Sequence, residues 1–225
     1  MSNVAASLRN LRIAATVSAV AHTLGAFAMA FVLSPGLLPG LLTPRMEYVR
    51  NNLFAWQCGW WLWIFSAIAF LVFILALKNH YSPIEITEFN KKLLSTALIL
   101  VSVAVCFDLF FEFQQIFSVP DVITGAHTDR KKFSLLQFGF TVFSGVIANF
   151  LYSGATICSV IAIRKYYPKW VNFLGWATCA FGLTASICAV MTSLLSIAWF
   201  SIAVNAVLFP LLIFWQAGFA LLAKE

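Results

Sequence analysis

The chain has 225 residues, a formal net charge of +6 at pH 7, 62% hydrophobic residues and only 10% charged residues. Soluble domains average roughly 25% charged residues, and a soluble protein of this size has no core that could hold so much apolar surface. The composition therefore excludes an ordinary soluble globular protein and predicts an integral membrane protein. Basic residues at the ends of membrane spans explain the positive charge, so no nucleic-acid partner is expected.

Six stretches are long enough and apolar enough to cross a bilayer, which needs about 20 apolar residues per helix. They cover about residues 11–34, 53–77, 93–116, 138–163, 170–191 and 194–222, with only Met191-Thr-Ser between the last two. Leu, Ile, Val, Ala and Phe alternate with no strict period of two, which favours helices over the strands of an outer-membrane barrel. We predict a single all-α domain over residues 1–225, a polytopic bundle of six transmembrane helices.

The basic residues predict the orientation of the bundle. With the N-terminus inside, nine of them flank the spans on the cytoplasmic side (Arg9, Arg12, Lys78, Lys91, Lys92, Arg164, Lys165, Lys169, Lys224) and five on the other (Arg45, Arg50, Arg130, Lys131, Lys132). Because cytoplasmic loops carry the excess of Lys and Arg, both termini are expected in the cytoplasm and the protein in the inner, or plasma, membrane. Arg9 and Arg12 before an apolar run also resemble a signal peptide, but the length of that run and His22 at its middle favour a retained helix.

Asp108 and Glu112 are the acidic residues inside the predicted spans, one helical turn apart, and Gln115 continues the same helical face. A charged group costs roughly 3 kcal/mol at the centre of a bilayer, so such residues usually face a protein interior or water and mark a functional site. At about 1.5 Å per residue from Lys92, Asp108 lies about 24 Å and Glu112 about 30 Å along the span. We therefore expect an outward-facing polar site, with Glu112 near enough to the interface that snorkelling to water is an alternative role. For Asp108 the alternative is a structural hydrogen bond between helices.

Other polar residues fall at similar depth. His22 lies on a stripe with Ala14, Ser18 and Gly25, whose small side chains allow another helix to approach closely. Asn149 and Tyr152 share one face of the fourth span, and Asn205 precedes Pro210, which removes the helical donor for the carbonyl of residue 206 and favours a kink. Hydrogen bonding between helices would explain each asparagine singly. Together, Asp108, Glu112, His22, Asn149, Tyr152 and Asn205 could line one cavity.

The sequence contains few other indications of chemistry. Five cysteines form no CxxC pair, only one of three histidines lies within a span, and no HExxH, Walker or GxSxG motif occurs. No cofactor or metal site is indicated. Trp56, Trp60, Trp61 and Trp63 crowd the start of the second span, where anchoring and packing are expected and a quinone or lipid-tail pocket is the alternative.

Two features bear on the arrangement of the spans. Gly59-Trp and Gly175-Trp open the second and fifth spans from opposite sides, which would relate two three-helix halves by inverted topology. Residues 118–137 are expected to form an external loop with a charged lead into the fourth span, and residues 78–92 a short cytoplasmic amphipathic element.

Four segments together resemble a family of bacterial six-span membrane proteins of unknown function. They are Gly59-Trp-Trp-Leu-Trp, Asp108 with Glu112, Ala148-Asn-Phe-Leu-Tyr, and Pro168-Lys-Trp-Val-Asn-Phe-Leu-Gly-Trp. The resemblance runs from the second span onward and implies a six-helix fold. It implies no substrate, cofactor or reaction.

Three classes of function follow from these residues. A transporter for a small molecule or ion, or a ligand-binding membrane protein, would use Asp108 with Glu112 as an outer relay, and Asn149, Tyr152 and Asn205 to orient the ligand. An accessory or assembly subunit would use its apolar faces to contact other membrane proteins. An intramembrane enzyme comes third, because two carboxylates and one distant histidine are a sparse set of metal ligands.

Overall fold

A computed structural model of the chain describes residues 2–37, 41–83, 86–125, 129–195 and 198–223, and within these ranges the protein is helical without strands. The long helices are α1 (Ser2–Ala28), α4 (Leu53–Tyr81), α5 (Glu88–Phe113), α8 (Asn149–Ile163), α9 (Lys169–Leu195) and α10 (Ala198–Leu222). The short helices are α2 (Ser34–Leu37), α3 (Leu42–Asn51), α6 (Val119–Thr124) and α7 (Arg130–Phe140). Three π-helical segments, η1 (Met29–Leu33), η2 (Gln114–Ser118) and η3 (Thr141–Ala148), connect α1 to α2, α5 to α6 and α7 to α8.

The described residues contain six helical stretches that are long and apolar enough to cross a membrane, which confirms the predicted number. Two boundaries differ from the prediction. Helix α9 continues to Leu195, so the residues expected to separate the last two spans are helical. The expected external loop over 118–137 is largely helical as well, because the third span continues through η2 into α6 and α7 begins at Arg130. Pro120 does not stop this helix: it lies where η2 runs into α6, and the carbonyls of Gln115 and Ile116, one turn earlier, accept from the Trp56 indole and the Gln57 side-chain amide.

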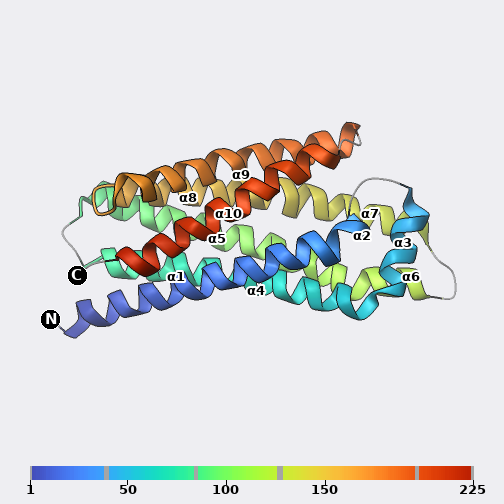
Figure 1. Ribbon diagram of the computed structural model, residues 1–225, viewed down its shortest axis with the longest axis horizontal. Coiled ribbons are helices and arrows are strands. Elements are labelled where there is room, and N and C mark those ends of the chain that lie inside the picture. Colours follow the sequence, from blue (N-terminus) through green and yellow to red (C-terminus); the bar gives the residue numbers. More distant parts are fainter. Residues whose placement is uncertain (1, 38–40, 84–85, 126–128, 196–197, 224–225) are drawn as a thin grey trace.

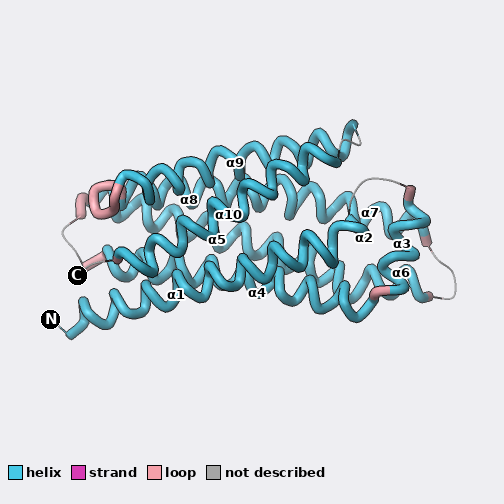
Figure 2. The backbone as a smooth tube through the Cα atoms, in the orientation of Figure 1, coloured by secondary structure: helices cyan, strands magenta, loops and turns pink. Residues whose placement is uncertain are grey.

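The six long helices form a closed ring. Each packs against the next along the chain, in the order α1, α4, α5, α8, α9 and α10, and α10 packs back against α1. Because neighbours run in opposite directions, the two chain ends lie at the same end of the bundle (Figure 1), and the tube in Figure 2 shows the helices side by side along its length. Small residues permit neighbouring helices to approach closely: a Cβ on Gly25 of α1 would lie 3.1 Å from Ser66 Oγ of α4.

The end of the ring near the termini is filled by aromatic side chains. Phe73, Trp215 and Phe219 are fully buried and pack edge to face, with centroids 5.2 to 5.7 Å apart. The guanidinium of Arg12 donates a 2.6 Å hydrogen bond to the carbonyl of Ala223, which joins α1 to the end of α10. The ring is therefore closed at this end by packed side chains.

The opposite end is covered by the short helices α2, α3, α6 and α7. Trp56 and Trp60 of α4 are fully buried there, and the Trp56 indole donates to the carbonyl of Gln115 at 2.9 Å. These two tryptophans therefore pack in the core instead of lying at the lipid interface. Arg50 donates to the carbonyl of Ile123 at 2.7 Å and so links α3 to α6.

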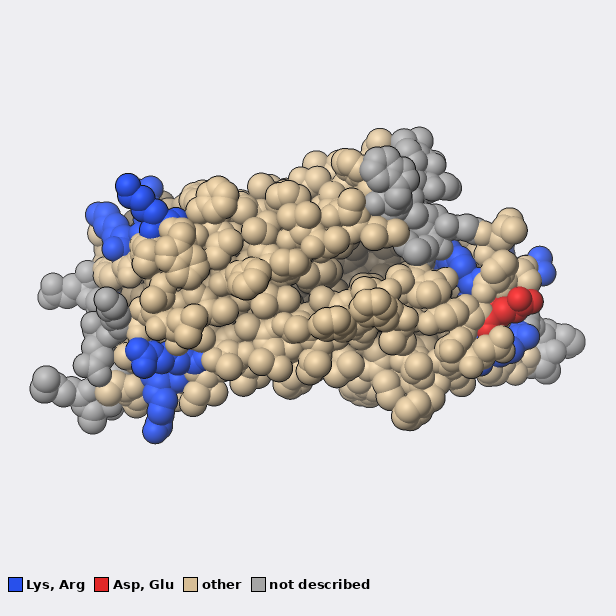
Figure 3. All heavy atoms as spheres, viewed as in Figure 1, with Lys and Arg blue, Asp and Glu red and all other residues tan. Residues whose placement is uncertain are grey.

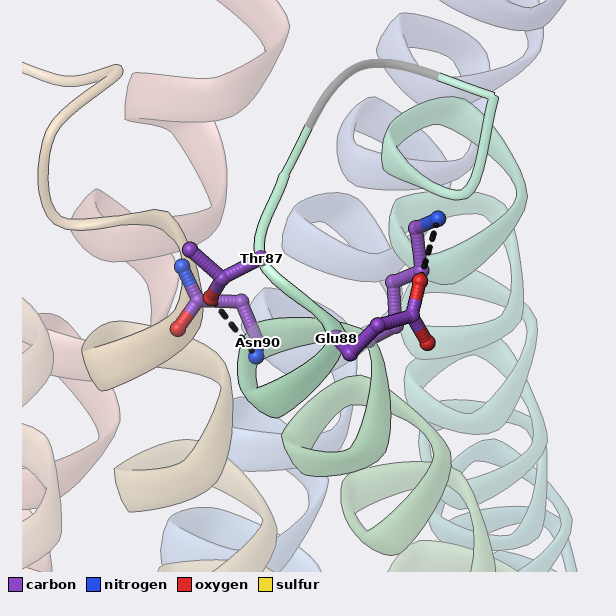
Figure 4. A network of polar contacts seen from close by, with 4 residues as sticks. Thr87, Glu88 and Asn90 are labelled. Atoms are coloured by element: carbon purple, nitrogen blue, oxygen red, sulfur yellow. Dashed lines mark hydrogen bonds and ion pairs between the residues drawn. The ribbon is translucent and has the colours of Figure 1, made fainter.

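Charged side chains gather at the two ends of the molecule, and the band between them is uncharged on the face shown in Figure 3. At the end near the termini, the expected amphipathic element over 78–92 is divided between the end of α4 and the start of α5. Thr87 caps α5 by accepting from the Asn90 backbone N–H, and Lys91 forms an exposed 2.9 Å ion pair with Glu88 (Figure 4). The arrangement fits a six-span membrane protein whose termini share one side.

Candidate functional site

A cavity of about 680 Å³ lies inside the ring, between the aromatic side chains near the termini and the short helices at the opposite end. It is lined by residues of α1, η1, α2, α4, α5, α7, η3, α8, α9 and α10. Five of the six residues singled out in the sequence line it: His22, Asp108, Asn149, Tyr152 and Asn205. The ring thus brings together polar groups from four spans.

Asp108 of α5 is the acidic residue among the described lining residues. It is 5% exposed, and its carboxylate accepts hydrogen bonds from the Ser144 hydroxyl of η3 and from the Tyr152 hydroxyl of α8, the latter at 2.7 Å. Charge-assisted hydrogen bonds of this kind are about twice as strong as neutral ones. Asp108 is therefore both part of an interhelical network and part of the cavity wall.

The amide and imidazole groups of the cavity bond to their own helices. Asn149 Nδ2 donates to the Gly145 carbonyl at 2.9 Å, and Asn205 Nδ2 donates to the Ser201 carbonyl at 2.8 Å. His22 Nδ1 lies 2.8 Å from the Ser18 carbonyl and packs edge to face on Phe70. The expectation that these asparagines bond between helices is therefore not met. Each asparagine donates a hydrogen bond within its own helix, which leaves its side-chain oxygen available as an acceptor.

Glu112 does not line the cavity, although it follows Asp108 by one turn. The side chain is fully buried, so the alternative in which it snorkels to water is wrong for this structure. Neither carboxyl oxygen has a hydrogen-bond partner among the described residues. The next turn is different, because the Gln115 side chain accepts from Gln137 at 2.8 Å.

The cavity opens sideways, between α10 and the segment formed by η1 and α2. In the described part of the chain α10 packs closely against α1, but not against η1 or α2. Apolar residues form the two margins, with Phe27 and Phe31 on one side and Ile202 and Ala206 on the other. Figure 3 shows a hollow on this face, and the described atoms at its margins are neither Lys or Arg nor Asp or Glu. The described margins of the opening are therefore apolar.

Sequence reasoning missed Ser144, which is one of the two partners of Asp108. Two of the π-helical segments, η1 and η3, supply cavity residues, and the chain gives no local indication that these turns widen. π-helical turns are frequent at functional sites. The Trp63 side chain also lines the cavity, so one member of the tryptophan cluster does contribute to a pocket.

The described residues contain no group of three or more His, Cys, Asp or Glu side chains placed to hold a metal ion. The five cysteines are unpaired, and Cys179 and Cys188 are buried. What the arrangement can do chemically is to hold a small molecule by hydrogen bonds, by the Asp108 charge and by aromatic contact.

No family model, curated protein or solved structure matches the chain significantly.

Proposed function

We propose that this membrane protein binds a small molecule in the cavity next to Asp108, as a transporter or as a ligand-binding protein. The observation that carries the proposal is the convergence of five of the predicted polar residues, from four spans, on one cavity in a bundle whose buried side chains are mostly apolar. Polar groups within a membrane are costly, and they usually line substrate or ion pathways. A cavity of this size with few polar groups and mostly apolar walls is typical of small-molecule sites.

The shape of the cavity supports uptake from the membrane. Phe73, Trp215 and Phe219 block the end near the termini, whereas the side between α10 and η1 is open. Transport would require this aromatic end to open while the side closes. Asp108 would then be the group whose charge a bound cation or proton neutralises. The states that open toward the two sides of the membrane would differ in whether a cation or a proton is bound to Asp108.

Native mass spectrometry of protein extracted with its lipids in polymer discs tests the proposal. The wild-type chain should retain a bound small molecule. Gly145 offers a matched pair of variants, because its Cβ would meet only Ala189 at 3.4 Å and Thr141 at 3.9 Å. Gly145→Phe should therefore fill part of the cavity and lose the bound mass, while Gly145→Ala should keep it.

The accessory-subunit hypothesis makes the opposite expectation for the same preparation. If other protein chains were retained in fixed stoichiometry and no small molecule were bound to either the wild type or Gly145→Ala, the cavity proposal would be abandoned for the subunit role.

A further inference from the structure

Most of the polar side chains that line the cavity already donate a hydrogen bond within the protein. The atom of Asn149 that faces the Gly145 carbonyl must be its NH₂ group, since two acceptors would repel, and the same holds for Asn205 and the Ser201 carbonyl. Both asparagines therefore keep a carbonyl oxygen, an acceptor, for any further partner. His22 Nδ1 donates to the Ser18 carbonyl, so Nε2 of the neutral ring is also an acceptor.

The hydroxyl groups repeat this pattern. Ser144 and Tyr152 donate to Asp108. Most other lining hydroxyls donate to the backbone carbonyl four residues earlier in their own helix; these are the hydroxyls of Thr23, Ser34, Thr141, Ser153, Thr156 and Thr178. The Ser66 hydroxyl donates to the carbonyl three residues earlier.

Acceptors therefore dominate the cavity. One carboxylate, two amide oxygens and one imidazole nitrogen can accept, and so can the oxygens of the hydroxyls that donate within the protein. The remaining donors among the described lining residues are the second N–H of Asn149 and of Asn205, the Ser201 hydroxyl and the Trp63 indole. No lysine or arginine is among these lining residues. A ligand that satisfies such a surface must bring hydrogen-bond donors, and a positive charge would complement Asp108.

We propose that the ligand is an amphipathic organic cation, a primary or secondary amine on an apolar body. A protonated secondary amine has two N–H groups and a protonated primary amine three, so the amine would donate to Asp108 and to one or both of the oxygens of Asn149 and Asn205. The aromatic rings of Phe70 and Tyr152, which pack against each other at 5.6 Å, offer faces that attract a cation. The apolar body would occupy the open side between α10 and η1. This inference rests on the proposed function, because it names the chemical class that the same cavity takes.

The test uses two photoreactive probes that differ only in their head group. One is a long-chain primary amine and the other a carboxylic acid of the same chain length, and both carry a diazirine at the same carbon. Each is added to the full-length protein in lipid nanodiscs, and adducts are mapped by peptide mass spectrometry. Labelling of cavity residues is divided by labelling of lipid-facing residues such as Ile99 and Phe173, which corrects for partition into lipid.

The amine should give a cavity-to-lipid ratio at least about tenfold above that of the acid, because hydrogen bonds to charged groups contribute more than the free energy of a tenfold preference. Asp108→Asn should lower the amine ratio toward the acid ratio. Glu112→Gln is the matched control, an acid-to-amide change one turn away that does not line the cavity, and it should leave the amine ratio unchanged. Thermal melting of both variants checks that they are folded.

The two levels of the hypothesis fail differently. Equal ratios for the two probes, or a higher ratio for the acid, would overturn the cationic ligand class while leaving a ligand-binding cavity in place. Absence of cavity labelling by both probes would overturn the ligand class together with the proposed function.

Discussion

Asp108 has two structural partners as well as a place in the cavity wall, so substitutions at this residue separate stability from binding. Asparagine keeps the shape of the side chain. Its Oδ1 can accept from one of the two hydroxyls that now donate to Asp108, those of Ser144 and Tyr152, and its NH₂ group can donate to the oxygen of the other. Asp108→Asn should therefore keep its melting temperature in detergent and lose ligand binding. Asp108→Leu leaves two hydroxyls without their acceptor and should lower the free energy of unfolding by roughly 1–3 kcal/mol.

The measurement is thermal melting of both variants beside the wild type, together with labelling by the amine probe. If Asp108→Leu melted at the wild-type temperature, the network with Ser144 and Tyr152 would contribute nothing to the fold.

Glu112 should behave in the opposite way. It is fully buried, and both carboxyl oxygens lack a hydrogen-bond partner among the described residues. Replacing a buried polar group without partners by an apolar one of similar size is often stabilising. Glu112→Met should therefore raise the free energy of unfolding by about 1 kcal/mol, whereas Glu112→Gln should bring no such gain. A lower melting temperature for the methionine variant would show that Glu112 has a partner, such as a buried water, that stabilises it.

Most of the residues predicted from the sequence line the cavity, but their hydrogen bonds were not predicted. Polar side chains are costly to place in hydrocarbon and stand out within apolar runs. For this reason the sequence predicted Asp108, His22, Asn149 and Asn205 as site residues. Two conclusions required the three-dimensional structure. Glu112 shares a helical face with Asp108, yet only packing against other helices decides which of them reaches the cavity. Ser144 is too small and too common in membrane helices to be singled out.

At the scale of elements, the relation of α10 to η1 decides how the cavity is reached. Ala206 of α10 is exposed and lies at the margin of the cavity, while Ala203 is exposed on the same helix but does not line it. Ala206→Trp should narrow the opening and reduce cavity labelling by the amine probe several-fold. Ala203→Trp should leave labelling unchanged, because its side chain extends away from the cavity margin.

Both variants are compared in nanodiscs with the wild type, at equal protein and probe concentrations. Equal labelling of Ala206→Trp and Ala203→Trp would show that ligands do not enter between α10 and η1.

Elements were predicted unevenly. Long apolar runs predicted the six spans because hydrophobic length alone separates a membrane helix from a loop. The π-helical segments and the continuation of the third span through Pro120 were not predicted. A π-helical turn depends on tertiary contacts, as where the Trp56 indole and the Gln57 side chain bond to the carbonyls of Gln115 and Ile116 in η2.

At the scale of the whole molecule, the ring places both termini at one end, and the excess of basic residues predicts that this end lies in the cytoplasm. A thiol reagent that cannot cross membranes should label Lys131→Cys and miss Asn79→Cys in intact cells, since both positions are exposed at opposite ends of the bundle. The background chain should have its five cysteines replaced. The reverse pattern of labelling would invert the orientation and place the open side of the cavity in the inner leaflet.

The central claim is that the cavity around Asp108 holds a small molecule. The most direct measurement is a high-resolution experimental structure of the protein extracted with its native lipids and without added ligand. We expect non-protein density inside the ring, with its polar end within hydrogen-bond distance of Asp108 and its apolar part between α10 and η1. A ring in which side chains fill this space, with Asp108 bonded only to Ser144 and Tyr152, would contradict the account.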